Sequence, residues 1–454
     1  MHGGVGDTEK SKTLKYLNLE REYSAHNYTP LPVVFARAQG AKVWDCDGKE
    51  YWDFGGSYCA VNQGHSHPEI VEALVKQSQT LALSSRAFTH DLFGEWSRFI
   101  CQTFDYEKVL PLNGGAEVVE AATKLARSWG YTSKGIPDGQ AVVLNFQGNY
   151  HGRTVLATSM STTPNARLNY GPYTPGVGPH WDTKDPTKVI RYNHIEDLEE
   201  ALNVVGKQVC AIIVESIQGE AGVIVPKDGY LQAIKALCKK HNVLYIADEI
   251  QVGLGRAGHM VYCESQGVKA DVLLLAKSIS GGLYPTSVML SSTDLMACIH
   301  PNSHGATFSG SPTSCAVSRA AVSVLMKENL CQRSVRLGTL LMAGLKQLKA
   351  DFQAIRDIRG AGLLIAIDID PTFLSSRKHT WNLWHLSMLL LQKKIIAKLV
   401  QTNTLKLTPP LVISDQGIRD CLQALRECFT ELPELSEIPG AAEFNSLGGS
   451  STLA

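Results

Sequence analysis

Short apolar runs alternate with amphipathic segments through the middle of the chain. Runs of four to eight apolar residues are typical of strands buried on both faces, and apolar residues at helical spacing indicate helices between them. The pattern predicts strands at 141–146, 211–215, 243–248, 272–276 and 287–290, and helices at 68–83, 117–129, 230–240 and 313–328. This alternation predicts an α/β fold whose large domain is a mostly parallel sheet flanked by helices.

The two ends of the chain have a different pattern. Polar and apolar residues alternate around Asp47-Gly48, which predicts a hairpin, and longer helices mixed with short strands follow from Ser334 onward. We expect a loose arm over about the first 25 residues. We also expect an N-terminal arm and hairpin (1–67) that joins a smaller C-terminal α+β domain (319–431), a large domain (68–318) and a loose tail (432–454).

Two of the predicted strands end in residues that can carry out chemistry. Lys277 follows the apolar run 272–276, and Asp248 ends the run 243–248. Parallel strands present their carboxyl ends at one edge, so both side chains are expected to face one site. Desolvation favours the neutral amine of a lysine, which attacks aldehydes, although an isolated lysine at a strand end more often extends into solvent. An acid beside such a lysine suits pyridoxal phosphate, because the lysine can hold the aldehyde as an imine while the acid keeps the ring nitrogen protonated.

Longer motifs make the hypothesis specific. The segments ADEIQVGLGRAG and LLLAKSISGGLYP resemble the class III, fold-type I pyridoxal-phosphate aminotransferases. A further ordered set narrows the resemblance to ornithine δ-aminotransferases: AHNYTPLPV, SYCAVNQGHSHP, SRAF, VLPLNGGAEVVEAATKLARSWGY, GNYHGRT, VESIQGEAGVIVP and HGATFSGSP. The resemblance implies a homodimeric enzyme that moves the terminal amine of ornithine, or of a close relative, to a keto acid such as 2-oxoglutarate. The product, glutamate semialdehyde, would cyclise to pyrroline-5-carboxylate.

Several residues are expected to hold the cofactor. Gly115 and Ala116 lie at the start of a predicted helix, where free backbone amides bind phosphate, although a glycine-rich turn is the alternative. The resemblance implies that Tyr150 stacks on the pyridine ring, that Gln251 binds the ring hydroxyl and that Thr307 reaches the phosphate of the neighbouring subunit. It also assigns the covalent bond to Lys277 and the ring nitrogen to Asp248.

The substrate residues come from the same resemblance. It implies that Arg153 holds the α-carboxylate of the donor with Tyr28 at the same end, and that Tyr58 separates ornithine enzymes from those acting on 4-aminobutyrate. The family's second carboxylate arginine is replaced by Lys406, which keeps the charge but lacks the planar fork. In the family that arginine pairs with a glutamate, matched here to Glu215, and is released to bind the keto acid.

The composition argues against nucleic-acid binding, membrane binding and metal binding. Lysine plus arginine and aspartate plus glutamate balance at 43 each, which gives no basis for nucleic-acid or membrane partners. The eleven cysteines are scattered without CxxC or Cys/His clusters, so we expect no metal site and reduced thiols in a cytoplasmic protein. The first 20 residues have neither the pattern of a transit peptide nor that of a secretory signal.

Three alternatives remain open. The chain could be another ω-aminotransferase, acting on lysine, acetylornithine or amines like 4-aminobutyrate. It could be a racemase or decarboxylase on the same fold, since these enzymes need the same lysine and aspartate. The third alternative is a non-catalytic binding protein, against which the intact Lys277 and Asp248 argue.

Overall fold

A seven-stranded sheet forms the centre of the protein. The computed structural model describes residues 12–182, 184–374, 381–400 and 403–438. The strand order is β4-β10-β9-β8-β7-β5-β6, in which β10 is antiparallel to both neighbours and the pairs from β9 to β6 are parallel. The strands are β4 (Lys108–Leu112), β5 (Val142–Leu144), β6 (Val177–Gly178), β7 (Val209–Glu215), β8 (Leu244–Asp248), β9 (Val272–Leu275) and β10 (Ser287–Ser291).

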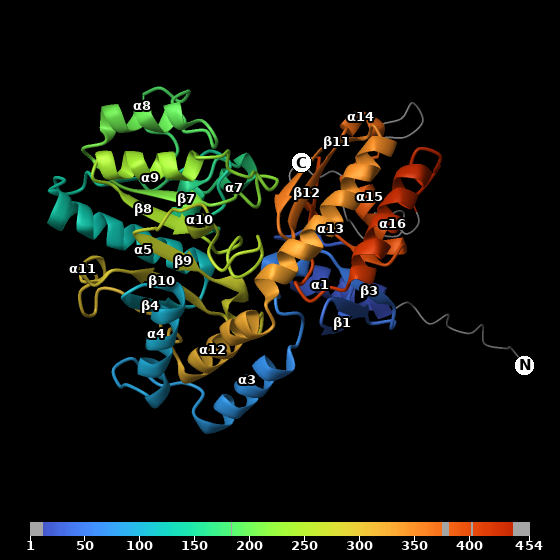
Figure 1. Ribbon diagram of the computed structural model, residues 1–454, viewed down its shortest axis with the longest axis horizontal. Coiled ribbons are helices and arrows are strands. Elements are labelled where there is room, and N and C mark those ends of the chain that lie inside the picture. Colours follow the sequence, from blue (N-terminus) through green and yellow to red (C-terminus); the bar gives the residue numbers. More distant parts are fainter. Residues whose placement is uncertain (1–11, 183, 375–380, 401–402, 439–454) are drawn as a thin grey trace, which may run out of the picture.

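Helices cover both faces of this sheet (Figure 1). Side chains of β7 alternate: Ile213 packs with the cluster under α5, whereas Ile212 and Val214 belong to the core on the opposite face. Every residue of β7 and β8 is therefore buried, as continuous apolar runs predict. The helices of this part are α3 (Pro68–Thr80), α4 (Asp91–Phe104), α5 (Gly115–Trp129), α6 (Val155–Met160), α7 (Pro164–Arg167), α8 (Ile195–Val205), α9 (Tyr230–Lys240), α10 (Tyr262–Ser265), α11 (Thr293–Met296) and α12 (Pro312–Lys327).

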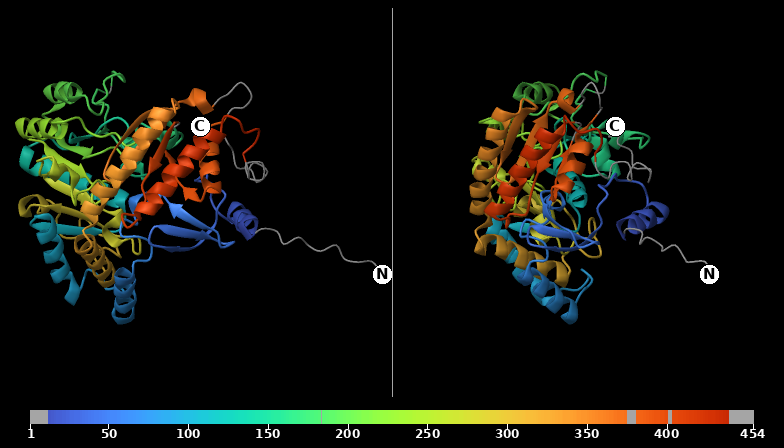
Figure 2. Two further views of the ribbon diagram at one scale, coloured as in Figure 1. Left: turned by 45° about the vertical axis from the view of Figure 1, so that its right-hand side comes forward. Right: turned by 90° about the vertical axis from the view of Figure 1, so that its right-hand side faces the viewer.

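Two smaller sheets join the ends of the chain (Figures 1 and 2). One contains the hairpin strands β1 (Phe35–Gln39), β2 (Lys42–Asp45) and β3 (Glu50–Asp53), extended by β13 (Ile395–Ile396) parallel to β3. The other is β11 (Ile355–Ala361), β12 (Leu364–Ile369), β15 (Thr404–Leu407) and β14 (Lys398–Val400). Helices α13 (Leu330–Asp351), α14 (Pro371–Leu374), α15 (Leu383–Gln392) and α16 (Asp415–Glu431) accompany these sheets.

The predicted α/β fold, its five strands, its four helices and the hairpin are confirmed. The pattern missed β4, whose Pro111 is tolerated because β4 lies at the edge of the sheet, and the two-residue β6. The expectation of a loose arm was wrong for residues 12–23, which form helix α1 (Lys12–Tyr23).

The expected domain limits stay predictions, and the boundary at 318/319 falls inside α12. Within the expected tail, Leu432 and Ile438 are buried, while residues 439–454 lie outside the described residues. The eleven cysteines all lie in the described part of the chain and are free thiols. No helix in the described ranges is long and apolar enough to cross a membrane.

Candidate active site

The predicted chemical groups meet at the carboxyl ends of three neighbouring parallel strands. Glu215 and Asp248 are the last residues of β7 and β8 and stand opposite each other in register. Asp248 is also paired with Leu274 of β9, and Lys277 follows two residues after the end of that strand. The parallel sheet therefore brings Lys277 and Asp248 to one edge.

Lys277 occupies a constrained backbone position. Its φ of 51° lies in the left-handed region, and it opens the 3₁₀ turn η2 (Lys277–Ser280). Asn62 Nδ2 donates to Ser278 Oγ at 2.9 Å, and Gln63 Nε2 donates to Ser278 O at 2.9 Å. Two side chains from the N-terminal part of the chain thus hold the turn that carries the lysine.

The surroundings of Lys277 favour its neutral amine. Its side chain is partly buried, and desolvation lowers its pKa below the ordinary value. Cys59, Glu220 and Asp248 act in the opposite direction, whereas the positive charge of Lys406 lowers the pKa further. A larger neutral fraction makes the amine a better nucleophile at neutral pH.

The start of α5 lies beside these groups. A Cβ atom built on Gly115 would lie 3.3 Å from Ile250 Cγ2 and 3.8 Å from Ala276 Cβ, so the helix begins next to the residues adjoining Asp248 and Lys277. Glu117 Oε2 accepts the N–H groups of Asn113 at 3.0 Å and Gly114 at 3.1 Å. The N–H groups of Gly115 and Ala116 follow in the first turn, where the helix itself offers no acceptor. They fit a phosphate beside the lysine.

Aromatic and cationic side chains lie near Glu220, whose charge also acts on Lys277. The Arg153 guanidinium lies 4.2 Å from the centre of the Tyr150 ring and is exposed. Burial raises the pKa of Tyr58, and the nearby Tyr28, Glu220 and Tyr150 raise it further. Tyr28, Tyr58 and Tyr150 therefore lie close enough to influence one another.

Tyr58 projects from a strained turn. Ser57, Tyr58 and Cys59 all have positive φ, between 46° and 70°, which L-residues seldom adopt. Asp53 Oδ1 accepts the N–H groups of Gly55 and Gly56, and Thr408 Oγ1 donates to Gly55 O at 2.9 Å. These bonds fix the turn to the chain that follows β15, so the positions of Tyr58 and Lys406 are linked.

The predicted pairing of Lys406 with Glu215 is wrong. Lys406 is fully buried, and its Nζ donates to Glu220 Oε1 at 2.5 Å and to Gln251 Oε1 at 3.5 Å. Gln251 Nε2 in turn donates to Glu220 Oε1 at 3.0 Å. A Cβ atom at Gly219 would lie 1.6 Å from Gln251 Oε1, so a larger residue there would displace the Gln251 side chain from Glu220 and Lys406.

Glu215 has a different environment. Its carboxylate is buried and accepts the N–H groups of Tyr150 at 3.0 Å and Gly219 at 3.4 Å. The segment VESIQGEAG contains both glutamates, and sequence spacing alone does not distinguish which one faces Lys406. Glu215, which ends β7, is bonded to loop backbone, whereas Glu220, beyond the turn, reaches Lys406.

Sequence reasoning missed other residues of the site. Asn62 and Gln63 support the Lys277 turn, and His151 contacts Asp248. Their signals were the motifs SYCAVNQGHSHP and GNYHGRT, in which they occur without an evident chemical role. Thr307 is exposed in the loop between α11 and α12.

We predict a pH-dependent effect of Glu215→Gln. Burial raises the pKa of Glu215 to about 7, with His151 lowering it and Asp248 raising it. An acid whose folded-state pKa is raised contributes stability fully below its unfolded pKa, and that contribution is lost as the pH rises through 7. Glutamine does not ionise, so the variant does not lose this stability. The free energy of unfolding of the variant minus that of wild type should therefore rise by about 2–3 kcal/mol from pH 5 to pH 8.

Chemical denaturation of the cofactor-free proteins at the two pH values measures this difference. Glu199→Gln, at an exposed position on α8, is the matched control and should give the same difference at both pH values. A pH-independent difference for Glu215→Gln would show that the Glu215 carboxylate ionises normally.

Comparisons with known proteins agree with this geometry. The family model Aminotransferase class-III matches residues 23–429. The chain is 47% identical over 423 residues to ornithine aminotransferase car2 of Schizosaccharomyces pombe, covering 93% of this chain and 95% of that one.

Solved structures give the same result. The ornithine aminotransferase of Toxoplasma gondii, with partial occupancy of pyridoxal phosphate at its active site, superposes with a TM-score of 0.86 at 39% identity, covering 93% of this chain and 95% of that one. The acetylornithine aminotransferase of Elizabethkingia anophelis superposes with a TM-score of 0.81 at 41% identity, covering 92% and 99%. The fold is that of a pyridoxal-phosphate-dependent transferase. Within that class, the chain belongs to the class III aminotransferase family.

Proposed function

We propose that this aminotransferase moves the terminal amine of ornithine, or of a close relative, to a keto acid such as 2-oxoglutarate. The product is glutamate semialdehyde, which cyclises to pyrroline-5-carboxylate. The observation that carries the proposal is the exposed Arg153 stacked on Tyr150, because a guanidinium fork there can bind the donor's α-carboxylate. Tyr28 and Tyr58 lie near Tyr150, and the similarity to ornithine aminotransferases supports the assignment.

Each residue of the site has a separate proposed role toward the cofactor. Bound pyridoxal phosphate supplies an aldehyde for amines and a ring that accepts electrons. Lys277 would hold the cofactor covalently, and its Nζ atom would carry the proton that is moved in the reaction. Asp248 holds the ring nitrogen, and the first turn of α5, at Gly115 and Ala116, holds the phosphate. Tyr150 covers the ring face, and Gln251 binds the ring hydroxyl.

A donor and acceptor panel tests the function. Purified enzyme is offered ornithine, acetylornithine, lysine, putrescine and 4-aminobutyrate, each with several keto acids, and the products are identified by mass spectrometry. Pyrroline-5-carboxylate from ornithine as the preferred reaction supports the proposal. Preference for acetylornithine would favour the second candidate, which the similarity to the Elizabethkingia anophelis structure supports.

The buried lysine leads to a prediction about the acceptor. Lys406 has the charge to bind a keto acid's carboxylate once it leaves Glu220, but it offers one compact charge instead of a bidentate fork. Lys406→Arg should therefore speed the half-reaction with 2-oxoglutarate by about tenfold, equivalent to roughly 1.4 kcal/mol. The half-reaction with ornithine should change little.

Stopped-flow traces of both half-reactions measure this effect. Lys406→Gln is the matched variant: it removes the charge and should slow the keto-acid step. If Lys406→Arg leaves that step unchanged or slows it, Lys406 serves a different acceptor, and the ornithine proposal weakens with it.

We also propose a homodimer with shared active sites, in which Thr307 reaches the phosphate in the partner. Large apolar side chains are exposed on α3, on the segment that follows it and beside α12: Val75, Leu81, Leu83, Phe88 and Phe308. Thr313 Oγ1 donates to Ala82 O at 2.9 Å, which ties the segment after α3 to the start of α12. Exposed apolar surface of this kind is typical of an interface.

The dimer predicts a linked loss of assembly and activity. Phe88→Asp should shift sedimentation toward the monomer and abolish most activity, because Thr307 no longer reaches a partner. Tyr170→Asp, at another exposed aromatic outside this surface, is the control. A fully active monomer would refute the shared site.

We propose that the enzyme acts in the cytoplasm. Eleven free cysteines suit a reducing compartment, since oxidising compartments favour paired thiols. Fractionation of source cells with activity assays tests this location, and activity confined to an organelle would contradict it.

A further inference from the structure

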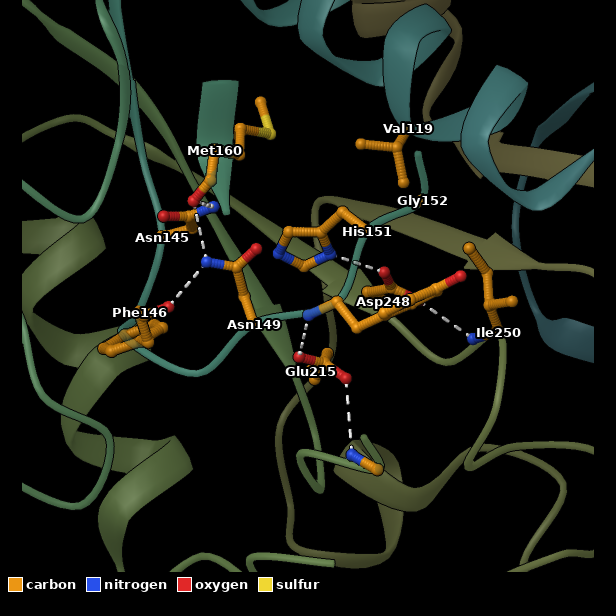
Figure 3. A network of polar contacts seen from close by, with 12 residues as sticks. Val119, Asn145, Phe146, Asn149, His151, Gly152, Met160, Glu215, Asp248 and Ile250 are labelled. Atoms are coloured by element: carbon orange, nitrogen blue, oxygen red, sulfur yellow. Dashed lines mark hydrogen bonds and ion pairs between the residues drawn. The ribbon is translucent and has the colours of Figure 1, made fainter. Parts of the chain in front are cut away.

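A buried histidine lies against the carboxylate at the end of β8 (Figure 3). The His151 Nδ1 and Asp248 Oδ2 atoms are 2.7 Å apart, and both side chains are buried. The other carboxylate oxygen, Oδ1, accepts the N–H of Ile250 at 3.1 Å. A protein donor on each oxygen fixes the orientation of the Asp248 carboxylate.

The loop around His151 is itself held tightly. Asn149 Nδ2 donates to Phe146 O and to Met160 O, each at 2.8 Å. On the other side, a Cβ atom at Gly152 would lie 2.5 Å from Ala116 Cβ, so the loop packs directly against α5. The loop that carries His151 is therefore held on both sides, which fixes where its side chain begins relative to Asp248.

Two buried carboxylates face the His151 ring. Asp248 faces it from β8 and Glu215 from β7, while α5 presents the apolar Val119 (Figure 3). Burial alone would lower the pKa of His151, but the hydrogen bond and charge of Asp248, with the charge of Glu215, raise it above the ordinary value. Both carboxylates therefore favour the protonated form of the ring over the neutral form.

Packing alone does not account for a histidine at this position. The His151 Nε2 atom is buried and has no hydrogen-bond partner among the described residues. An unpaired buried polar atom costs about 1–3 kcal/mol, which a hydrocarbon ring of similar size would avoid. The bond to Asp248 is the contact that a hydrocarbon ring could not make.

We propose that His151 is a positioning residue that acts through Asp248. It holds the carboxylate toward the place of the cofactor's ring nitrogen. The inference rests on the role proposed for Asp248, and it adds a residue to which the family resemblance gave no role.

The first test needs neither cofactor nor turnover. In NMR titrations of the cofactor-free protein, the His151 ring should titrate above the ordinary range. In Asp248→Asn its midpoint should fall by about one pH unit or more, because a charge-assisted hydrogen bond is lost. His385→Gln, at a buried histidine of α15, should leave the His151 midpoint unchanged. An unchanged midpoint in Asp248→Asn would overturn the inference.

The second test is a double-mutant cycle. His151→Phe should lower kcat for the amine half-reaction by about 10- to 100-fold with little change in the donor KM, while borohydride still labels Lys277. His151→Gln keeps a hydrogen-bond donor but cannot carry a charge, so its kcat should lie between those of wild type and His151→Phe. In the Asp248→Asn background, His151→Phe should cost nothing further.

The outcomes separate the inference from the role of Asp248. Additive losses in the cycle, or a folded His151→Phe enzyme with unchanged kcat, would reduce His151 to packing and overturn the inference alone. Full turnover by Asp248→Asn would overturn both. If circular dichroism shows that His151→Phe is unfolded, His151→Gln and the NMR titration decide: normal kcat in His151→Gln together with an ordinary midpoint overturns the proposal.

Discussion

Replacing Lys277 by alanine should lower transamination by about 10⁴-fold, because one amine both binds the cofactor and moves the proton. The residue stands at the end of β9 in a left-handed turn held by Asn62 and Gln63. Burial also keeps its pKa low, which makes it more nucleophilic than a surface lysine.

The measurement combines turnover with chemical labelling. Borohydride reduction of the wild-type holoenzyme followed by peptide mapping should place the cofactor on Lys277, and the variant should carry no label there. Lys346→Ala, at an exposed lysine of α13, is the control and should retain both label and activity. A label on another lysine, or an active Lys277→Ala enzyme, would refute the assignment.

Replacing Arg153 by alanine should reduce kcat/KM for ornithine by about 10²-fold and leave putrescine nearly unaffected. Ornithine carries an α-carboxylate that the guanidinium fork can bind, whereas putrescine has only amines. Losing a charge-assisted contact of this type costs roughly 2–3 kcal/mol in the specificity constant. Arg153→Lys should fall between, because it keeps the charge and loses the fork.

The two donors serve as internal references for each other. Arg37→Ala is the matched control, since Arg37 stacks over Trp44 at 3.7 Å on β1, outside the site. It should not change the ratio of the two donors. Equal losses on ornithine and putrescine in Arg153→Ala would mean that the arginine supports the Tyr150 ring and does not bind the carboxylate.

The sequence by itself determined the central strands of the sheet and the groups at their carboxyl ends. Fully buried parallel strands must be apolar along their whole length, so β7, β8 and β9 are visible as continuous runs. Because parallel strands end at one edge, the first polar residues after two of these runs had to meet, which placed Asp248 beside Lys277. The motifs added the family, since glycines and polar residues at fixed spacing are more specific than periodicity.

Contacts between distant segments were decided only by the tertiary structure. The choice of Glu220 over Glu215 as partner of Lys406 depends on the turn at Gly219 and on a strand almost two hundred residues later. The left-handed φ of Lys277 depends on Asn62 and Gln63, far earlier in the chain. His151, in the loop after β5, likewise meets Asp248 of β8 only in the assembled sheet, in which β7 lies between these two strands. Local pattern reports which face of an element is buried, but charge pairing depends on ångström-scale distances that only the packed fold sets.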